Sequence, residues 1–148
     1  MKKEALVQYL IAQLQEKVVA SQEAIASTKA ARDSDTKSSA GDKHEVGREM
    51  AQRELDAQEA QLSKTVILLH VLKGLPLDKE LGCVGLGSLV VTDMGTYFIS
   101  IGIGQVEFDE QNVFVISLAS PIGQLLNGKK EGETINFNGK KIKIFEVN

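Results

Sequence analysis

The first half of the chain repeats a hydrophobic pattern with alternating steps of four and three residues. This spacing places its members on one stripe of an α-helix, and a stripe with a period of about 3.5 residues is the seam of a coiled coil. The two repeats are Val7, Ile11, Leu14, Val18, Ser21, Ile25 and Thr28, followed by Ala51, Leu55, Gln58, Leu62, Val66 and Leu69. Small polar residues at 33–41 predict a turn between them. We therefore expect an antiparallel coiled-coil helical hairpin with its tip at about residues 33–45.

The composition changes at residues 73–76. Ala, Gln, Glu and Lys dominate before this point, whereas ten of the 13 glycines and most β-branched and aromatic residues follow it. A glycine followed closely by a proline, as at Gly74 and Pro76, commonly ends a helix. We therefore expect two domains, the helical hairpin in residues 1–75 and a second domain in residues 76–148.

The second half has the alternation of β-strands. Strand-like runs cover 86–92, 96–102 and 112–119, and the segment 133–147 predicts a hairpin around Asn138 and Gly139. Between them, Ser120 is a suitable N-cap, Pro121 suits a first helical turn, and Gly128 lies where a helix ends. The predicted order is β-β-β-α-β-β, a small, mostly antiparallel sheet with one short helix. The whole chain is therefore expected to be α+β.

The hydrophobic runs, the cysteine count and the net charge limit the class of protein. No apolar run is long enough to span a bilayer, and polar residues interrupt the N-terminal segment too early for a signal peptide, so no membrane partner is expected. The single cysteine, Cys83, predicts no internal disulfide and fits a cytoplasmic location. A net charge of −3 argues against free-standing DNA binding through a broad basic face.

Two acidic residues, Asp42 and Glu45, lie at the predicted tip, where the second helix begins. An acidic N-cap followed three residues later by Glu is a variant of the capping box, and both charges favour the positive end of the helix dipole. Alternatively, two carboxylates on a projecting arm could hold a Mg²⁺ ion whose other ligands come from a partner. The two interpretations are compatible. Nearby basic residues, among them Arg32, Lys43 and Arg48, predict either phosphate contacts or a solvated helix end.

Two segments resemble a known family. Residues 120–133, SPIGQLLNGKKEGE, are similar to the "SPI…L(I)GK…GD" segment of the bacterial transcript-cleavage factors GreA and GreB. Residues 41–45, GDKHE, resemble the same family's G-D-x-x-E motif, and the likeness extends over nearly the whole chain. The resemblance implies an N-terminal coiled-coil hairpin and an FKBP-like C-terminal domain.

The resemblance also implies a mechanism on RNA polymerase. The C-terminal domain would dock at the rim of the secondary channel, with Ser120, Pro121, Ile122 and Gly128 as the polymerase-binding residues. The arm would enter the channel, where Asp42 and Glu45 stabilise the polymerase's second Mg²⁺ ion and its attacking water.

The RNA side of that mechanism concerns the basic residues of the tip. Arg32, Lys43 and Arg48 would contact the backtracked RNA 3′ end, which the polymerase then cleaves. The polymerase is the enzyme and the chain an accessory factor, which binds no metal by itself.

Two alternatives stay open at this point. Related proteins share the fold and the channel site but regulate the polymerase without cleavage. A different class is an adaptor whose coiled coil pairs with another helical protein. A self-contained prolyl isomerase is the least favoured, because the sequence contains no convergent catalytic set.

Overall fold

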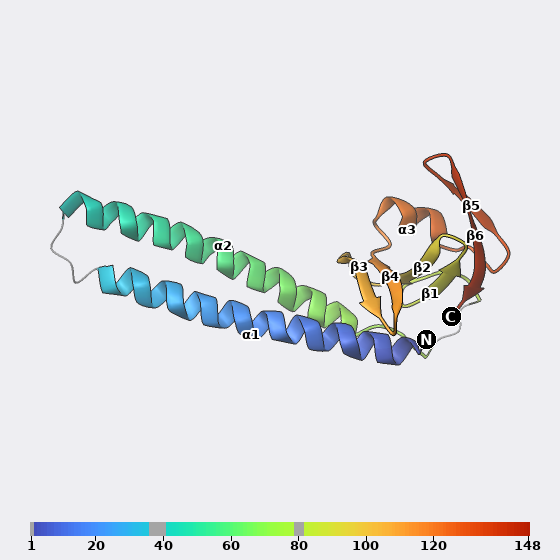
Figure 1. The fold of residues 1–148 in the computed structure, drawn as a ribbon, viewed down its shortest axis with the longest axis horizontal. Helices are drawn as coiled ribbons and strands as arrows, with labels where there is room; N and C mark the ends of the chain where they lie inside the picture. The colour runs from blue at the N-terminus through green and yellow to red at the C-terminus, as the bar shows by residue number, and fades with distance from the viewer. Residues whose placement is uncertain (1, 36–40, 79–81) are drawn as a thin grey trace. The chain divides into compact units, whose positions relative to one another are not determined.

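The computed structural model describes residues 2–35, 41–78 and 82–148, with the backbone alone described at 35 and 41–44. The described chain is α+β, with two long helices followed by a six-stranded mixed sheet and a short helix (Figure 1). It forms two compact units, which we call the helical unit (Ile11–His70) and the sheet unit (Met1–Leu10 with Val71–Asn148). The first ten residues therefore group with the sheet, although the sequence analysis placed them with the hairpin.

Helix α1 covers Lys3–Asp35 and helix α2 covers Gly41–Lys73. As predicted, α2 ends just before Gly74, whose amide donates to the carbonyl of Val71 at 3.1 Å. In the helical unit, the predicted stripe of α1 is less exposed to solvent than the rest of the helix. Leu14 and Ile25 are buried, the other stripe positions are half-buried, and the residues between them are exposed. The 3.5-residue period thus selects the inward face of α1.

The predicted stripe of α2 needs one correction. Leu55 is buried as expected, but Val66 is 48% exposed whereas its neighbour Thr65 is 3% exposed. Strict alternation requires a step of three after Leu62, which leads to Thr65, and the prediction followed hydrophobicity to Val66 instead. The Thr65 hydroxyl is accommodated because it donates to the Gln61 carbonyl of its own helix at 3.0 Å.

Within Ile11–His70 the two helices run side by side in opposite directions (Figure 1). Contacts between them include the Arg32 Nη1 bond to Gln52 Oε1 at 2.9 Å and the Lys29 ion pair with Glu59 at 4.0 Å. Both pairs join the end of α1 to the first two-thirds of α2, as a reversal of the chain requires. The supercoil of a coiled coil stays a prediction.

Alanine substitutions on α2 should destabilise the chain at inward positions and have little effect at outward positions. Leu55→Ala is expected to lower the free energy of unfolding by about 2–3 kcal/mol, because it leaves a cavity at a buried site. Val66→Ala should change it by less than about 0.5 kcal/mol. Chemical denaturation followed by far-ultraviolet circular dichroism measures both free energies of unfolding. An equal loss of stability in the two variants would show that Val66 belongs to the buried seam.

Six strands form the sheet. They are β1 (Leu89–Thr92), β2 (Gly95–Ile99), β3 (Gly104–Phe108), β4 (Gln111–Ile116), β5 (Thr134–Phe137) and β6 (Lys140–Val147). The spatial order is β3-β4-β2-β1-β6-β5, in which β2 and β4 are parallel and all other neighbours antiparallel. The expectation of a mostly antiparallel sheet is confirmed, whereas the FKBP-like fold stays a prediction.

Strand β3 is not among the strands predicted from the sequence. Its turn to β4 is made by Asp109 and Glu110, both with positive φ (54° and 59°), and Glu110 stands where such a turn usually has Gly. The predicted hairpin between β5 and β6 is confirmed, with Asn138 and Gly139 at φ 51° and 78°. The two turns have similar backbone geometry, but only the second has a recognisable sequence.

The sheet buries side chains on both faces. On one face the core consists of Val84, Val90, Tyr97, Ile99, Leu126, Ile135, Ile142 and Ile144, with helix α3 (Pro121–Leu126) against β5. On the other face Leu89, Phe98, Val113 and Val115 are buried. Tyr9 of α1 packs on Phe108 of β3 with the ring centroids 5.1 Å apart. Residues 1–10 therefore contribute to the packing of the sheet unit.

Candidate functional site

The predicted acidic pair lies at the start of α2, since the helix begins at Gly41 and places Asp42 in its first turn. The side chains of Asp42 and Lys43 lie outside the described residues. Glu45 and Arg48 are exposed. Positions 42 and 45, and likewise 45 and 48, are three apart along the helix, so each pair of positions shares one face of α2.

Arg32 lies in the last turn of α1 and forms a hydrogen bond to α2. Its side chain is only 23% exposed, because Nε donates to Asp33 Oδ1 at 3.2 Å and Nη1 donates to Gln52 Oε1 at 2.9 Å. Gln52 Nε2 in turn donates to Asp56 Oδ1 at 3.0 Å. Arg32 therefore links the two helices, and its expected contact with RNA stays a prediction. Gln52 and Asp56 were missed, and their spacing of four on α2 was the available signal.

A shallow hollow of about 370 Å³ lies along α2 and is lined by Glu45, Arg48, Glu49 and Gln52. It brings together two of the predicted tip residues, Glu45 and Arg48, and adds Glu49 one turn beyond Glu45. Exposed carboxylates at positions i and i+4 offer oxygen ligands on one face, which suits a hard cation such as Mg²⁺ when a partner completes its shell. Arg48 beside them offers a guanidinium to phosphate.

The segment at 120–128 has the predicted capped helix. Ser120 Oγ accepts from the Gly123 amide at 3.1 Å and donates to the Ser117 carbonyl at 2.7 Å. Pro121 occupies the first turn, and Gly128 has a φ of 80° just beyond the helix. The cap of α3 is confirmed.

The four expected polymerase contacts divide into two kinds. Pro121 and Gly128 are exposed, whereas Ser120 is half-buried with its hydroxyl engaged in the cap, and Ile122 packs against the core. Leu125 adds an apolar side chain that is 38% exposed. The positions of this segment exposed to a partner therefore include Pro121, Leu125 and Gly128. Gly123, buried beneath this turn, was missed as a special position.

Comparisons of the chain with protein families, curated proteins and solved structures gave no significant match. Across the three described ranges, no helix is both long and apolar enough to cross a membrane. The same ranges contain no group of three or more His, Cys, Asp or Glu side chains that could hold a metal ion.

Proposed function

We propose that the chain is a Gre-type transcription elongation factor that binds RNA polymerase at its secondary channel and stimulates cleavage of backtracked RNA. The observation that carries this proposal is the exposure of Glu45, one turn inside the start of α2 and three residues after Asp42. At 1.5 Å per residue, a helix of 33 residues is about 50 Å long. An arm of this length can present carboxylates inside a partner.

The carboxylates have a defined task in this proposal. The exposed Glu45 supplies anionic oxygen atoms of the kind that Mg²⁺ prefers, and Asp42 lies at the right spacing to add another. A Mg²⁺ ion shared with the polymerase would lower the pKa of a bound water and support in-line attack on the phosphodiester.

The neighbouring basic residues would orient the RNA. Arg48 is exposed beside Glu45, where its guanidinium can pair with a phosphate of the RNA 3′ segment. Lys43 is one residue from Asp42 and serves the same purpose. Arg32 would act first by holding α1 against Gln52 of α2, which fixes the helix that bears the acids.

The sheet unit would dock on the rim of the channel. Pro121, Leu125 and Gly128 are exposed at and just beyond α3, and the Ser120 cap and the close packing at the buried Gly123 hold that turn in place. A rigid apolar surface flanked by polar residues is a common form of binding site. In this arrangement the polymerase contacts the sheet unit, and the acidic end of α2 stays free.

A channel-binding regulator without cleavage activity is the second candidate. The family motif continues as E-N-A-E-Y, whereas this chain has Glu45, Val46, Gly47, Arg48 and Glu49. Val46 is 56% exposed and has no polar group to bind a water or an RNA atom. The adaptor is less favoured, because the seam residues Leu14, Ile25 and Leu55 are already buried within the helical unit.

The experiment is an RNA-cleavage assay on stalled, backtracked elongation complexes of the cognate polymerase. The proposal predicts release of short 3′ RNA fragments and recovery of elongation when the chain is added with Mg²⁺. Competition with a channel-binding reference factor measures binding separately. Competition without cleavage would favour the regulator, and absence of both would contradict any role at the channel.

A further inference from the structure

The outward face of β6 carries basic and aromatic side chains together. Ile142 and Ile144 point into the core, at 3% and 0% exposure, so Lys141, Lys143 and Phe145 project to the opposite face. On β5, Thr134 pairs with Lys143 and Asn136 pairs with Lys141, which places both on that face. We call Thr134, Asn136, Lys141, Lys143 and Phe145 the outer strip.

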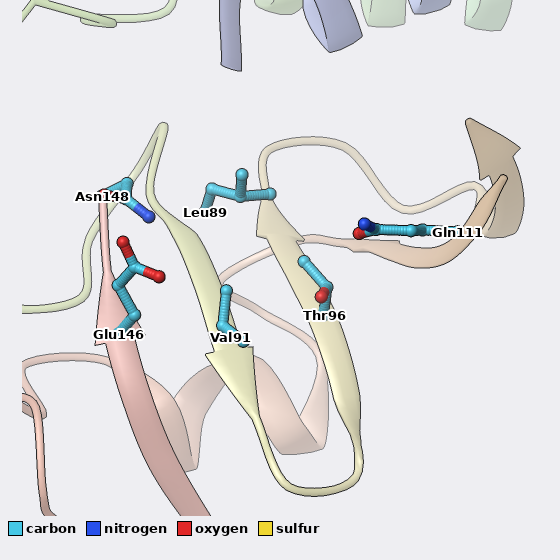
Figure 2. A pocket seen from close by; sticks show the side chains of 6 residues that line it. All are labelled: Leu89, Val91, Thr96, Gln111, Glu146 and Asn148. Carbon is cyan, nitrogen blue, oxygen red and sulfur yellow. The ribbon is translucent and has the colours of Figure 1, made fainter. Parts of the chain in front are cut away.

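A β-bulge connects the outer strip to a hollow. Val91 of β1 pairs with Glu146, but the next residue, Thr92, pairs with Ile144, so Phe145 and Glu146 together oppose Val91. Beyond the bulge lies a hollow of about 310 Å³ (Figure 2). It is lined by Leu89, Val91, Thr96, Gln111, Glu146 and Asn148. The hollow thus combines an apolar floor on β1 with hydroxyl, amide and carboxylate groups around it.

The lysines of the outer strip have no ionic partner in the part of the chain that the structure describes. Within the described ranges, neither Lys141 nor Lys143 forms an ion pair. Nearby acids are used otherwise, because Asp93 Oδ1 accepts from the Lys143 backbone amide at 2.9 Å and Glu131 Oε1 accepts from the Val147 amide at 3.3 Å. The two ammonium groups therefore remain available beside Phe145, which is 54% exposed.

We propose that the outer strip and the adjoining hollow bind single-stranded RNA. Phe145 would stack on a base, and Lys141 and Lys143, about 7 Å apart along the strand, would pair with successive phosphates. This combination of an exposed aromatic ring and cations on a sheet is how many single-strand binding domains work.

The hollow gives the reason to choose RNA. Thr96, Gln111 and Asn148 offer donors and acceptors to a base edge and to a ribose 2′-hydroxyl, the group that distinguishes RNA from DNA. Glu146 can accept a hydrogen bond from an exocyclic amine of a base. The net charge of −3 confines the binding to this local surface, since a duplex would need a broader basic face. This inference does not depend on the proposed function at the polymerase.

The test uses the full chain without polymerase and a fluorescently labelled single-stranded RNA of mixed sequence, followed by anisotropy at several salt concentrations. Saturable binding is expected, and Phe145→Ala should weaken it by about tenfold or more. The double variant Lys141→Gln with Lys143→Gln should reduce the slope of log K against log salt by about 1.4. Lys129→Gln with Lys130→Gln removes the same charge elsewhere in the sheet unit and should preserve most of the binding.

Several results would overturn the inference. Absence of saturable binding at low salt would do so, as would equal weakening by the control pair of lysines. Equally tight binding of the matching DNA strand would contradict the assignment to RNA. Equally tight binding of a polyglutamate peptide, unaffected by Phe145→Ala, would indicate an acidic protein as the ligand. Circular dichroism of each variant excludes unfolding as the cause.

Discussion

Glu45→Gln is expected to lower the rate of polymerase-dependent RNA cleavage by about 100-fold or more while leaving binding to the polymerase unchanged. The substitution keeps the size of the side chain and removes the charge that would bind Mg²⁺. Glu45 is exposed, so no buried contact of the chain is lost. Asp42→Asn should have a similar effect. Single-turnover cleavage of backtracked complexes at saturating factor gives the rate.

Glu49→Gln is the matched control for this loss. Glu49 lines the same hollow and is also exposed, but it lies one helical turn farther from the start of α2. We expect it to retain most of the cleavage activity. If all three variants cleave as well as wild type, Asp42 and Glu45 serve as a helix cap and take no part in cleavage, whereas a wild type that competes for the channel without cleaving would favour the regulator. Neutralising them should then cost only about 0.3–1 kcal/mol each in the stability of the helical unit.

Gly123→Ala is expected to destabilise the sheet unit by about 3 kcal/mol. A Cβ at this position would overlap the backbone oxygen of Ser117 and lie 2.7 Å from Ser120 Oγ. These are the two atoms that hold the N-terminus of α3, so either the cap hydrogen bonds break or the helix shifts. Leu126, which is fully buried in the core, would move with it. The consequence should be loss of the surface around Pro121 as well as loss of stability.

Gly102→Ala is the control for this substitution. Gly102 is exposed, has no positive φ, and a Cβ there would meet no atom within 4 Å. Its effect should lie within about 0.5 kcal/mol. Denaturation followed by tyrosine fluorescence is suited to the comparison, because both tyrosines, Tyr9 and Tyr97, belong to the sheet unit. Equal stability of the two variants would contradict the close packing at Ser117.

Features that depend on a few neighbouring residues could be predicted from the sequence. The end of α2 at Lys73, the Ser120 cap of α3 and the turn at Asn138 and Gly139 were all expected. Each is decided by local backbone stereochemistry and by hydrogen bonds that span only three or four residues. The inward stripe of α1 belongs to the same group, because a helical period is itself a local property.

At the candidate site, too, local features could be predicted from the sequence and contacts between distant residues could not. Periodicity and spacing were enough to place Asp42, Glu45 and Arg48 on the start of one helix. The engagement of Arg32 could not be foreseen, because its partner Gln52 is 20 residues away and belongs to the other helix. The role of Gly123 was likewise hidden, since it depends on how closely the Ser117 carbonyl approaches.

The sequence by itself determined where the chain turns into helix or strand and which residue types lie at the ends of those elements. The tertiary structure decided the parallel pairing of β2 with β4, the addition of β3 to the sheet, and the choice of Thr65 over Val66 for the seam. It also placed Phe145 and Glu146 side by side on the outer face through a bulge. These outcomes depend on partners distant in the sequence, whose packing and hydrogen bonding outweigh the local preference of any single residue.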